Sequence, residues 1–292
     1  QSGSHNKIQT REQSAALTGE LLSALEISPN DPLKLLEVPE AVLTATQRKV
    51  IGKLGYRFEP NIDGISFTEH PFIPNAPKLT ARVPMMLGTT RTELSNQLGR
   101  EEAIYDMTET EMLTRIARFF PPEDVSNLVS VFKKSNPSAN STELYFLMTS
   151  WRSYVQNATV MAEARAEMNG GDNPTWMYSV TWKSPAEGGR RYSQHTLDLP
   201  FMFDNVDRAL HLTGPESEET RYMAEAMSEA WLAFARTGDP NHKMIPRWSP
   251  YGLNTRNVMH FDVPAEQVSD PFREEREFMR RYSSVRQTAR RN

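Results

Sequence analysis

The sequence predicts an α/β fold with a mostly parallel sheet, and three observations lead to that class. Segments with apolar residues at helical spacing alternate with short segments that are apolar or rich in β-branched and aromatic residues. One short segment, VPMML at 83–87, is apolar throughout, as is typical of a strand covered on both faces. No internal repeat and no linker-like stretch divides the 292 residues, whose number alone permits one large domain or two small ones.

Helices are predicted in the first half of the chain from apolar spacing and from the residues that begin and end them. Residues 12–26 place leucines at helical spacing, and a second helix begins at Pro39, because proline suits the first helical turn. The segment TETE at 108–111 has the pattern of a capping box, which predicts a helix start. The two prolines at 121–122 end that helix and begin the next.

The second half of the chain predicts two long helices and two strands. The helices cover residues 142–168 and 217–236, and Gly238 with the proline after it ends the second one. Residues 176–182 and 257–262 have the composition of strands. Together with the strand at 83–87, they complete the alternation of an α/β sheet.

Composition excludes several classes of protein and site. The sequence has 33 basic and 37 acidic residues with the signs mixed, which gives no electrostatic footprint for nucleic acid. The apolar runs are too short to span a bilayer, and the absence of cysteine excludes disulfides and thiol nucleophiles. Nucleotide-binding and zinc motifs are missing, so we expect no cofactor and no metal. Cellular location is left open.

The C-terminal segment from Arg273 onward is rich in arginine and glutamate around a few aromatic residues. This composition is typical of a surface helix rather than of an arm that binds nucleic acid. The sequence therefore predicts a solvated terminal helix with a frayed end.

Two loops carry the residue types that chemistry needs. In parallel sheets, reacting side chains gather in the loops after the carboxyl ends of the strands. One such loop, GTTRTE at 88–93, holds Glu93, and another, SQHTLDLP at 193–200, holds His195. A carboxylate beside a histidine fixes its tautomer and stabilises the imidazolium, and acid before histidine is the order in α/β-hydrolase triads. From spacing alone, it stays open that Glu93 caps a helix and His195 is an ordinary loop residue.

A nucleophile is missing from this pattern. The sequence contains no G-x-S-x-G segment, the sharp turn that presents a catalytic serine in such hydrolases. By itself, the chain does not complete a triad.

Several longer segments carry a family resemblance that covers essentially the whole chain. They are QSG at 1–3, FEPNIDG at 58–64, VPMMLGTTRTE at 83–93, HTLDLPFMF at 195–203, WLAFARTGDPN at 231–241 and WSPY at 248–251. These segments resemble the C-terminal half of the type-B carboxylesterases, the family of the bacterial p-nitrobenzyl esterases and the cholinesterases. The resemblance implies an α/β-hydrolase fold, with residues 1–292 as the C-terminal portion of a single domain.

The resemblance also implies roles for individual residues. Glu93 and His195 match the catalytic acid and base, and Ser2 occupies a position that supports the acid through a hydrogen bond. The alternative for Ser2 is a serine that satisfies backbone at a strand end. Asp198 is expected to bond loop amides near His195 rather than to compete as the acid. Thr196 stands where many relatives have glycine, which puts the shape of the pocket in doubt.

The resemblance places the serine nucleophile and the oxyanion hole upstream of Gln1, on an N-terminal segment of the same protein. The leading interpretation is therefore a cofactor-free serine esterase that cleaves small-molecule carboxylic esters together with that segment. A triad-deficient relative that acts as a binding or adhesion domain is the alternative. A relative that hydrolyses amides or carbamates is a third possibility.

Overall fold

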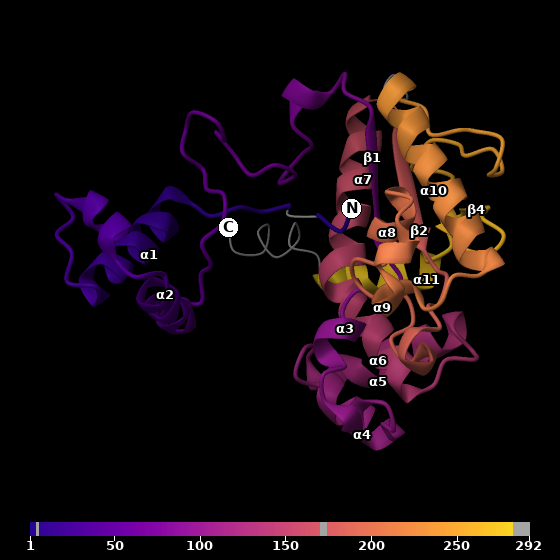
Figure 1. Ribbon diagram of the computed structural model, residues 1–292, viewed down its shortest axis with the longest axis horizontal. Helices are drawn as coiled ribbons and strands as arrows, with labels where there is room; N and C mark the ends of the chain where they lie inside the picture. The colour runs from indigo at the N-terminus through magenta and orange to yellow at the C-terminus, as the bar shows by residue number, and fades with distance from the viewer. Residues whose placement is uncertain (4–5, 170–173, 283–292) are drawn as a thin grey trace. The chain divides into compact units, whose positions relative to one another are not determined.

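The computed structural model describes residues 1–3, 6–169 and 174–282, which form two compact units (Figure 1). The larger unit consists of the first three residues and the described residues from Asn75 onward. The smaller unit covers the described residues up to Pro74. The single domain stays a prediction.

The larger unit is built on a sheet of four strands in the order β1-β2-β3-β4. The strands are β1 (Met85–Thr90), β2 (Thr175–Val180), β3 (Asn257–Phe261) and β4 (Glu266–Ser269). The first three run parallel, and β4 pairs antiparallel with β3. The predicted α/β class with a mostly parallel sheet is confirmed.

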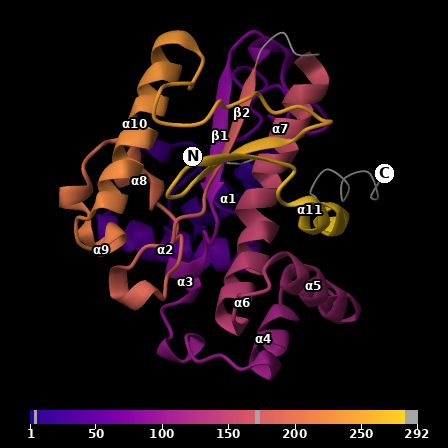
Figure 2. The same ribbon diagram turned by 90° about the vertical axis from the view of Figure 1, so that its right-hand side faces the viewer.

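Helices cover both faces of this sheet. Helix α7 (Gln156–Asn169) lies on one side of β1 and β2, and α10 (Glu218–Thr237) with α8 (Asp198–Met202) lies on the other (Figure 2). Tyr178 of β2 is opposite Gly88 of β1, where a Cβ atom would lie 2.3 Å from the tyrosine ring. Glycine at position 88 is therefore what lets the Tyr178 ring cross β1. The side chains between sheet and α10 include Trp176, Val180, Met223, Met227, Trp248 and Phe261.

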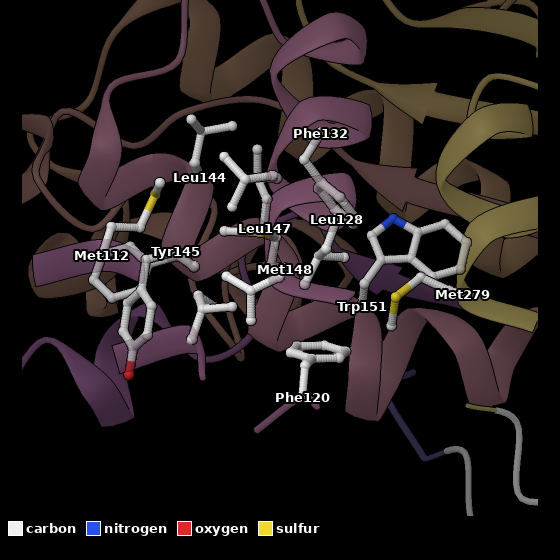
Figure 3. Close-up of a cluster of buried hydrophobic side chains, with 14 of the residues drawn as sticks. Met112, Phe120, Leu128, Phe132, Leu144, Tyr145, Leu147, Met148, Trp151 and Met279 are labelled. Carbon is white, nitrogen blue, oxygen red and sulfur yellow. The ribbon is translucent and has the colours of Figure 1, made fainter. Parts of the chain in front are cut away.

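A second apolar core lies among helices beside the sheet. Helices α4 (Glu109–Ile116), α5 (Pro122–Ser135), α6 (Ser141–Ser150) and α11 (Arg273–Met279) contribute to it. Figure 3 shows the buried side chains of this core, with Trp151 and Met279 at one end and Met112 and Tyr145 at the other.

The predicted long helix at 142–168 is present, with a wider turn in its middle. Helix α6 continues through a π-turn at Trp151–Val155 into α7, and the amide of Gln156 donates to the carbonyl of Trp151, five residues back. A π-turn accommodates one extra residue without ending the helix. The two halves of the helix therefore share an axis but face different neighbours.

Helix starts and ends follow their sequence signals. Thr108 and Glu111 form the predicted capping box, with the amide of Glu111 donating to Thr108 Oγ1 at 3.2 Å. Ser217 caps α10 in the same way, and Gly238 ends it with a φ of 77°. These predictions are confirmed.

The smaller unit is a pair of helices, α1 (Arg11–Ala24) and α2 (Glu40–Leu54), joined through the 3₁₀ turn η1 (Pro32–Glu37). Leu17 and Leu21 of α1 pack with Val50 of α2 in its small core. Pro39 is the N-cap residue of α2, so the helix begins at Glu40, one residue after its predicted start.

The remaining elements are short: η2 (Lys78–Thr80), α3 (Ser95–Leu98), η3 (Glu102–Ile104), η5 (Ala186–Gly189), η6 (Val206–Arg208), α9 (Leu210–Thr213) and η7 (Arg280–Tyr282). Within the described ranges, no helix combines the length and the apolar character needed to cross a membrane.

The terminal helix corrects the prediction of a solvated surface helix. In α11, Glu275 and Met279 are fully buried, and Arg276 and Phe278 are nearly so. The two charged side chains are buried because each finds charged partners, Arg91 for Glu275 and Asp270 for Arg276. The predicted frayed end beyond residue 282 lies outside the described residues.

Candidate active site

Backbone hydrogen bonds join the two loops that the sequence singled out. The amide of Thr92 donates to the carbonyl of Ser193 at 3.0 Å, and the amide of Ser193 donates to Thr92 Oγ1 at 2.9 Å. The amide of Arg91 donates to the carbonyl of Val180, the last residue of β2. Parallel pairing of β1 with β2 brings both loops to one edge of the sheet, and these bonds fix their separation.

Glu93 is the centre of the site. Its side chain is fully buried, and Oε2 lies 2.5 Å from Nδ1 of His195. Its other oxygen accepts hydrogen bonds from Ser2 Oγ at 2.5 Å and from the amide of Thr90 at 2.8 Å. A buried carboxylate needs such donors, because burial without them is costly. The structure thus brings together Ser2, Glu93 and His195 as a connected set.

Ser2 reaches Glu93 from beside β1, where its amide donates to the carbonyl of Gly88 at 2.8 Å. Its backbone thus contacts the strand while its hydroxyl contacts the acid. The two interpretations that the sequence left open for Ser2 are both present in its contacts.

His195 is partly exposed, with 28% of its side chain accessible. The hydrogen bond that Glu93 accepts from His195 raises the pKa of His195 above its ordinary value, burial opposes that shift, and the charges of Glu93 and Asp198 add to it. This arrangement favours the imidazolium and holds Nδ1 as the protonated nitrogen of the neutral ring.

Tyr154 faces His195 and was not singled out in the sequence. The centroids of the two rings are 5.2 Å apart, with the ring planes tilted by 40°. Tyr154 stands inside the π-turn, whose extra residue carries no recognisable sequence signal. Apolar spacing along the helix predicted only a continuous helical face there, so Tyr154 was missed.

Thr196 adopts a backbone conformation that favours glycine. Its φ is 73°, in the left-handed region that costs a β-branched residue on the order of 1 kcal/mol. Its hydroxyl donates to the carbonyl of His195, and the amide nitrogen of Asn96 donates to the same carbonyl at 3.4 Å. Two side chains, those of Thr196 and Asn96, therefore hold the carbonyl group of His195 in place.

Asp198 is buried behind the histidine loop and accepts a hydrogen bond from the hydroxyl of Tyr178 at 3.1 Å, a partner that the sequence did not predict. Burial raises the pKa of Asp198, and the charge of Glu93 raises it further. Burial and the Asp198 charge also raise the pKa of Tyr178 well above its ordinary value. Asp198 thus belongs to a buried pair with Tyr178.

In the part of the chain that the structure describes, no group of three or more histidine, aspartate or glutamate side chains is arranged to hold a metal ion. The ionisable groups gathered around His195 are Glu93 and Asp198. The chemistry that this arrangement supports is transfer of a proton at the imidazole.

The sequence was compared with models of known protein families. The model of the Carboxylesterase family matches residues 9–279, nearly the whole chain. The chain belongs to the carboxylesterase family. This confirms the resemblance to type-B carboxylesterases that the sequence motifs indicated.

Individual carboxylesterases align along most of the chain. The para-nitrobenzyl esterase of Bacillus subtilis is 24% identical over 288 residues, which cover 93% of this chain and 54% of that protein. Carboxylesterase EST55 of Geobacillus stearothermophilus is 26% identical, with a TM-score of 0.67, over 92% of this chain and 55% of that chain. The α/β-hydrolase fold is thereby confirmed. The chain spans about half the length of the relatives that it matches.

Proposed function

We propose that this chain supplies the acid and the base of a Ser-Glu-His triad in a serine hydrolase that cleaves carboxylic esters. The hydrogen bond between Glu93 and His195 carries the proposal. It joins a fully buried carboxylate to a partly exposed imidazole at the edge of the sheet where the loops meet. Membership of the carboxylesterase family supports an ester as the substrate.

The proposed chemistry follows from the states of these side chains. His195 takes the proton of a serine hydroxyl as the serine oxygen forms a bond to the ester carbonyl carbon. The imidazolium then gives that proton to the departing alcohol as the ester C–O bond breaks, and water repeats the sequence to release the acid. Glu93 stays ionised and holds the Nδ1–H tautomer, which keeps Nε2 available for the serine. Ser2 and the amide of Thr90 hold Glu93 in place.

The serine and the oxyanion hole are proposed to lie on an N-terminal segment of the same protein. This chain spans about half the length of the relatives that it matches, which supports a further portion. Strand β1 stands at the end of the described strand order, and sheet edges of this kind are usually paired or covered.

The proposed substrates are small-molecule esters. The Bacillus relative is named a para-nitrobenzyl esterase, and a Pseudarthrobacter oxydans protein that is 31% identical over 89 residues is named a phenmedipham hydrolase. Both names describe hydrolysis of small molecules.

The deciding experiment combines covalent labelling with turnover. A protein that contains this chain and the proposed N-terminal segment is incubated with a fluorophosphonate probe, and intact mass is measured. We expect one adduct on a serine of that segment, and loss of both adduct and ester turnover in Glu93→Ala and His195→Ala. His211→Ala, at an exposed histidine, serves as the control and should keep both.

The pH dependence gives a second readout. Because the base must be neutral, turnover should fall as the pH drops through the raised pKa of His195, above the ordinary 6.5 of histidine. Turnover at the wild-type rate in His195→Ala would refute the triad. A folded protein that takes no adduct would favour the binding or adhesion domain.

A further inference from the structure

Glu275 of α11 is the second fully buried glutamate of the larger unit, and it accepts four hydrogen bonds from side chains. The guanidinium of Arg91 donates to both of its oxygens, at 2.9 and 3.2 Å. The side-chain amide of Asn136 donates to Oε1 at 2.9 Å, and the indole nitrogen of Trp151 donates to Oε2. Three donor side chains from separate parts of the fold therefore meet at one carboxylate.

The first of these donors belongs to the acid loop. Arg91 precedes Glu93 by two residues, and its backbone amide donates to the carbonyl of Val180. Its guanidinium also lies over the ring of Phe272 at 4.5 Å and donates to Asn136 Oδ1 at 3.1 Å. A bidentate pair between guanidinium and carboxylate fixes direction as well as distance. Glu275 thus fixes one end of the turn that presents Glu93.

The Trp151 donor belongs to the π-turn that also carries Tyr154. Trp151 opens the π-turn, and Tyr154 in the same turn faces the ring of His195. The amide of Leu94, next to Glu93, also donates to Ser150 Oγ at 3.0 Å, immediately before the π-turn. The acid loop and the π-turn are therefore joined directly to each other and jointly to Glu275.

We propose that Glu275 is a positioning residue for His195, which through Arg91 and Trp151 holds Glu93 and Tyr154 on two sides of the imidazole. Glu275 is not itself near the reacting atoms, and it acts only through the side chains that it binds. The role of the positioned histidine as a base rests on the proposed function. The positioning can be measured on the imidazole itself, without turnover.

The neighbouring residue of α11 provides a matched control. The guanidinium of Arg276 pairs with Asp270 at 2.8 Å, and both side chains are nearly buried. Among the described residues, its other ion-pair partners are Glu163 and Glu277, which belong to neither loop of the site. Arg276→Met therefore breaks a buried ion pair in the same helix without releasing the acid loop.

The experiment is an NMR titration of the His195 imidazole in the 292-residue chain and in three variants. Glu275→Gln removes the carboxylate charge, Arg91→Lys keeps the charge but loses the bidentate pair, and Arg276→Met is the control. The charged and aromatic groups that face His195 are Glu93, Asp198 and Tyr154, and all remain in every variant. A change in the pKa of His195 therefore reports a change in their positions.

We expect the wild-type pKa of His195 to lie above 6.5, and Glu275→Gln and Arg91→Lys to lower it by about half a unit or more, a roughly threefold change in proton affinity. Arg276→Met should leave it unchanged. An unchanged pKa in folded Glu275→Gln and Arg91→Lys would overturn the proposal, as would an equal decrease in Arg276→Met. If Glu275→Gln does not fold, Arg91→Lys decides.

The two proposals fail in different ways. Absence of a fluorophosphonate adduct on the companion segment would remove the esterase function but leave the coupling of Glu275 to His195 measurable. A normal adduct together with an unchanged His195 pKa in the folded variants would remove the positioning role alone.

Discussion

Glu93 and Glu275 are the same residue type, both are fully buried and each binds three residues through hydrogen bonds, yet their surroundings differ in kind. Glu275 pairs with the guanidinium of Arg91, which is positively charged at every pH that a protein meets. Glu93 pairs with an imidazole, whose charge changes near neutral pH, and with a hydroxyl and an amide that carry none. The partner, rather than burial, separates a carboxylate suited to structure from one suited to proton transfer.

The difference extends to exposure of the partners. Arg91 is almost closed off from solvent at 13% side-chain exposure, whereas His195 retains 28%. A buried ion pair with a permanent charge holds its place, and a partly open imidazole can exchange a proton with another molecule. Four measurements test whether the partners of Glu93 and Glu275 set their different roles.

The largest expected difference between variants of Glu93 and Glu275 is in the rate of ester turnover. In the proposed esterase, Glu93→Gln should lower kcat by roughly 10³- to 10⁴-fold, because an amide neither stabilises the imidazolium nor enforces the Nδ1–H tautomer. Glu275→Gln should lower kcat by roughly 10- to 100-fold through misplacement alone. Steady-state ester hydrolysis measures both. Equal decreases in kcat in Glu93→Gln and Glu275→Gln would contradict the different roles assigned to the two carboxylates.

The loss of stability should be larger in Glu275→Gln than in Glu93→Gln, the opposite of the order expected for turnover. Glu275→Gln leaves the charge of Arg91 without its partner in a nearly buried place, which should cost about 3–5 kcal/mol in the free energy of unfolding. Glu93→Gln leaves only neutral hydrogen-bonding groups unsatisfied and should cost about 1–3 kcal/mol. Urea denaturation of both variants tests the ranking, and a more damaging Glu93→Gln would contradict it.

A second histidine shows what the permanent charge of Arg91 does. His260 stacks on Phe272, and burial, followed by the Arg91 charge, lowers its pKa from 6.5 to about 4. The unfolded state therefore binds this proton first, so the free energy of unfolding should fall as the pH drops from about 6.5 towards 4. The loss should reach at most about 3 kcal/mol.

His260→Phe keeps an aromatic ring but cannot titrate, so chemical denaturation at a series of pH values should show a flatter acid side for this variant. The exposed His211→Phe serves as the control and should leave that side unchanged. An equally steep fall in His260→Phe would assign the acid sensitivity to other groups.

The smallest expected effect concerns Tyr154. An aromatic face near an imidazolium is worth about 0.5–1 kcal/mol, so Tyr154→Leu should lower the pKa of His195 by roughly half a unit. NMR titration of His195 measures the change, with Tyr56→Leu in the smaller unit as the control. A raised pKa in Tyr154→Leu would mean that the tyrosine mainly limits hydration of the imidazole.

Local signals predicted much of the fold because each acts over a few residues. The capping pair of Thr108 and Glu111 and the left-handed Gly238 are set by neighbouring backbone, and both stand where the sequence placed them. The first strand begins at Met85 rather than at residue 83, because Pro84 has no amide to donate to a neighbouring strand. Strand β4 was missed, since its largely solvated residues carry no apolar pattern.

The candidate site likewise has a part that the sequence predicted and a part that it did not. Loops after parallel strands, with family motifs, predicted Glu93 and His195 as a pair, and the structure places them in contact. Glu275 looked like one more charge in an arginine- and glutamate-rich helix, because its partner Arg91 is 184 residues away in sequence. Contacts over such separations leave no periodic pattern that a single sequence could reveal.

The π-turn at Trp151–Val155 has a consequence for how this chain tolerates insertions and deletions. Each residue of an α-helix turns the chain by about 100°, so the extra residue rotates α7 relative to α6 by about that angle. The continuous helix can therefore contact α4 and α5 through α6, its first half, and β1 and β2 through α7, its second half. Losing a single residue here would turn every later side chain of α7 away from the sheet, whereas losing one from an exposed loop would alter only that loop.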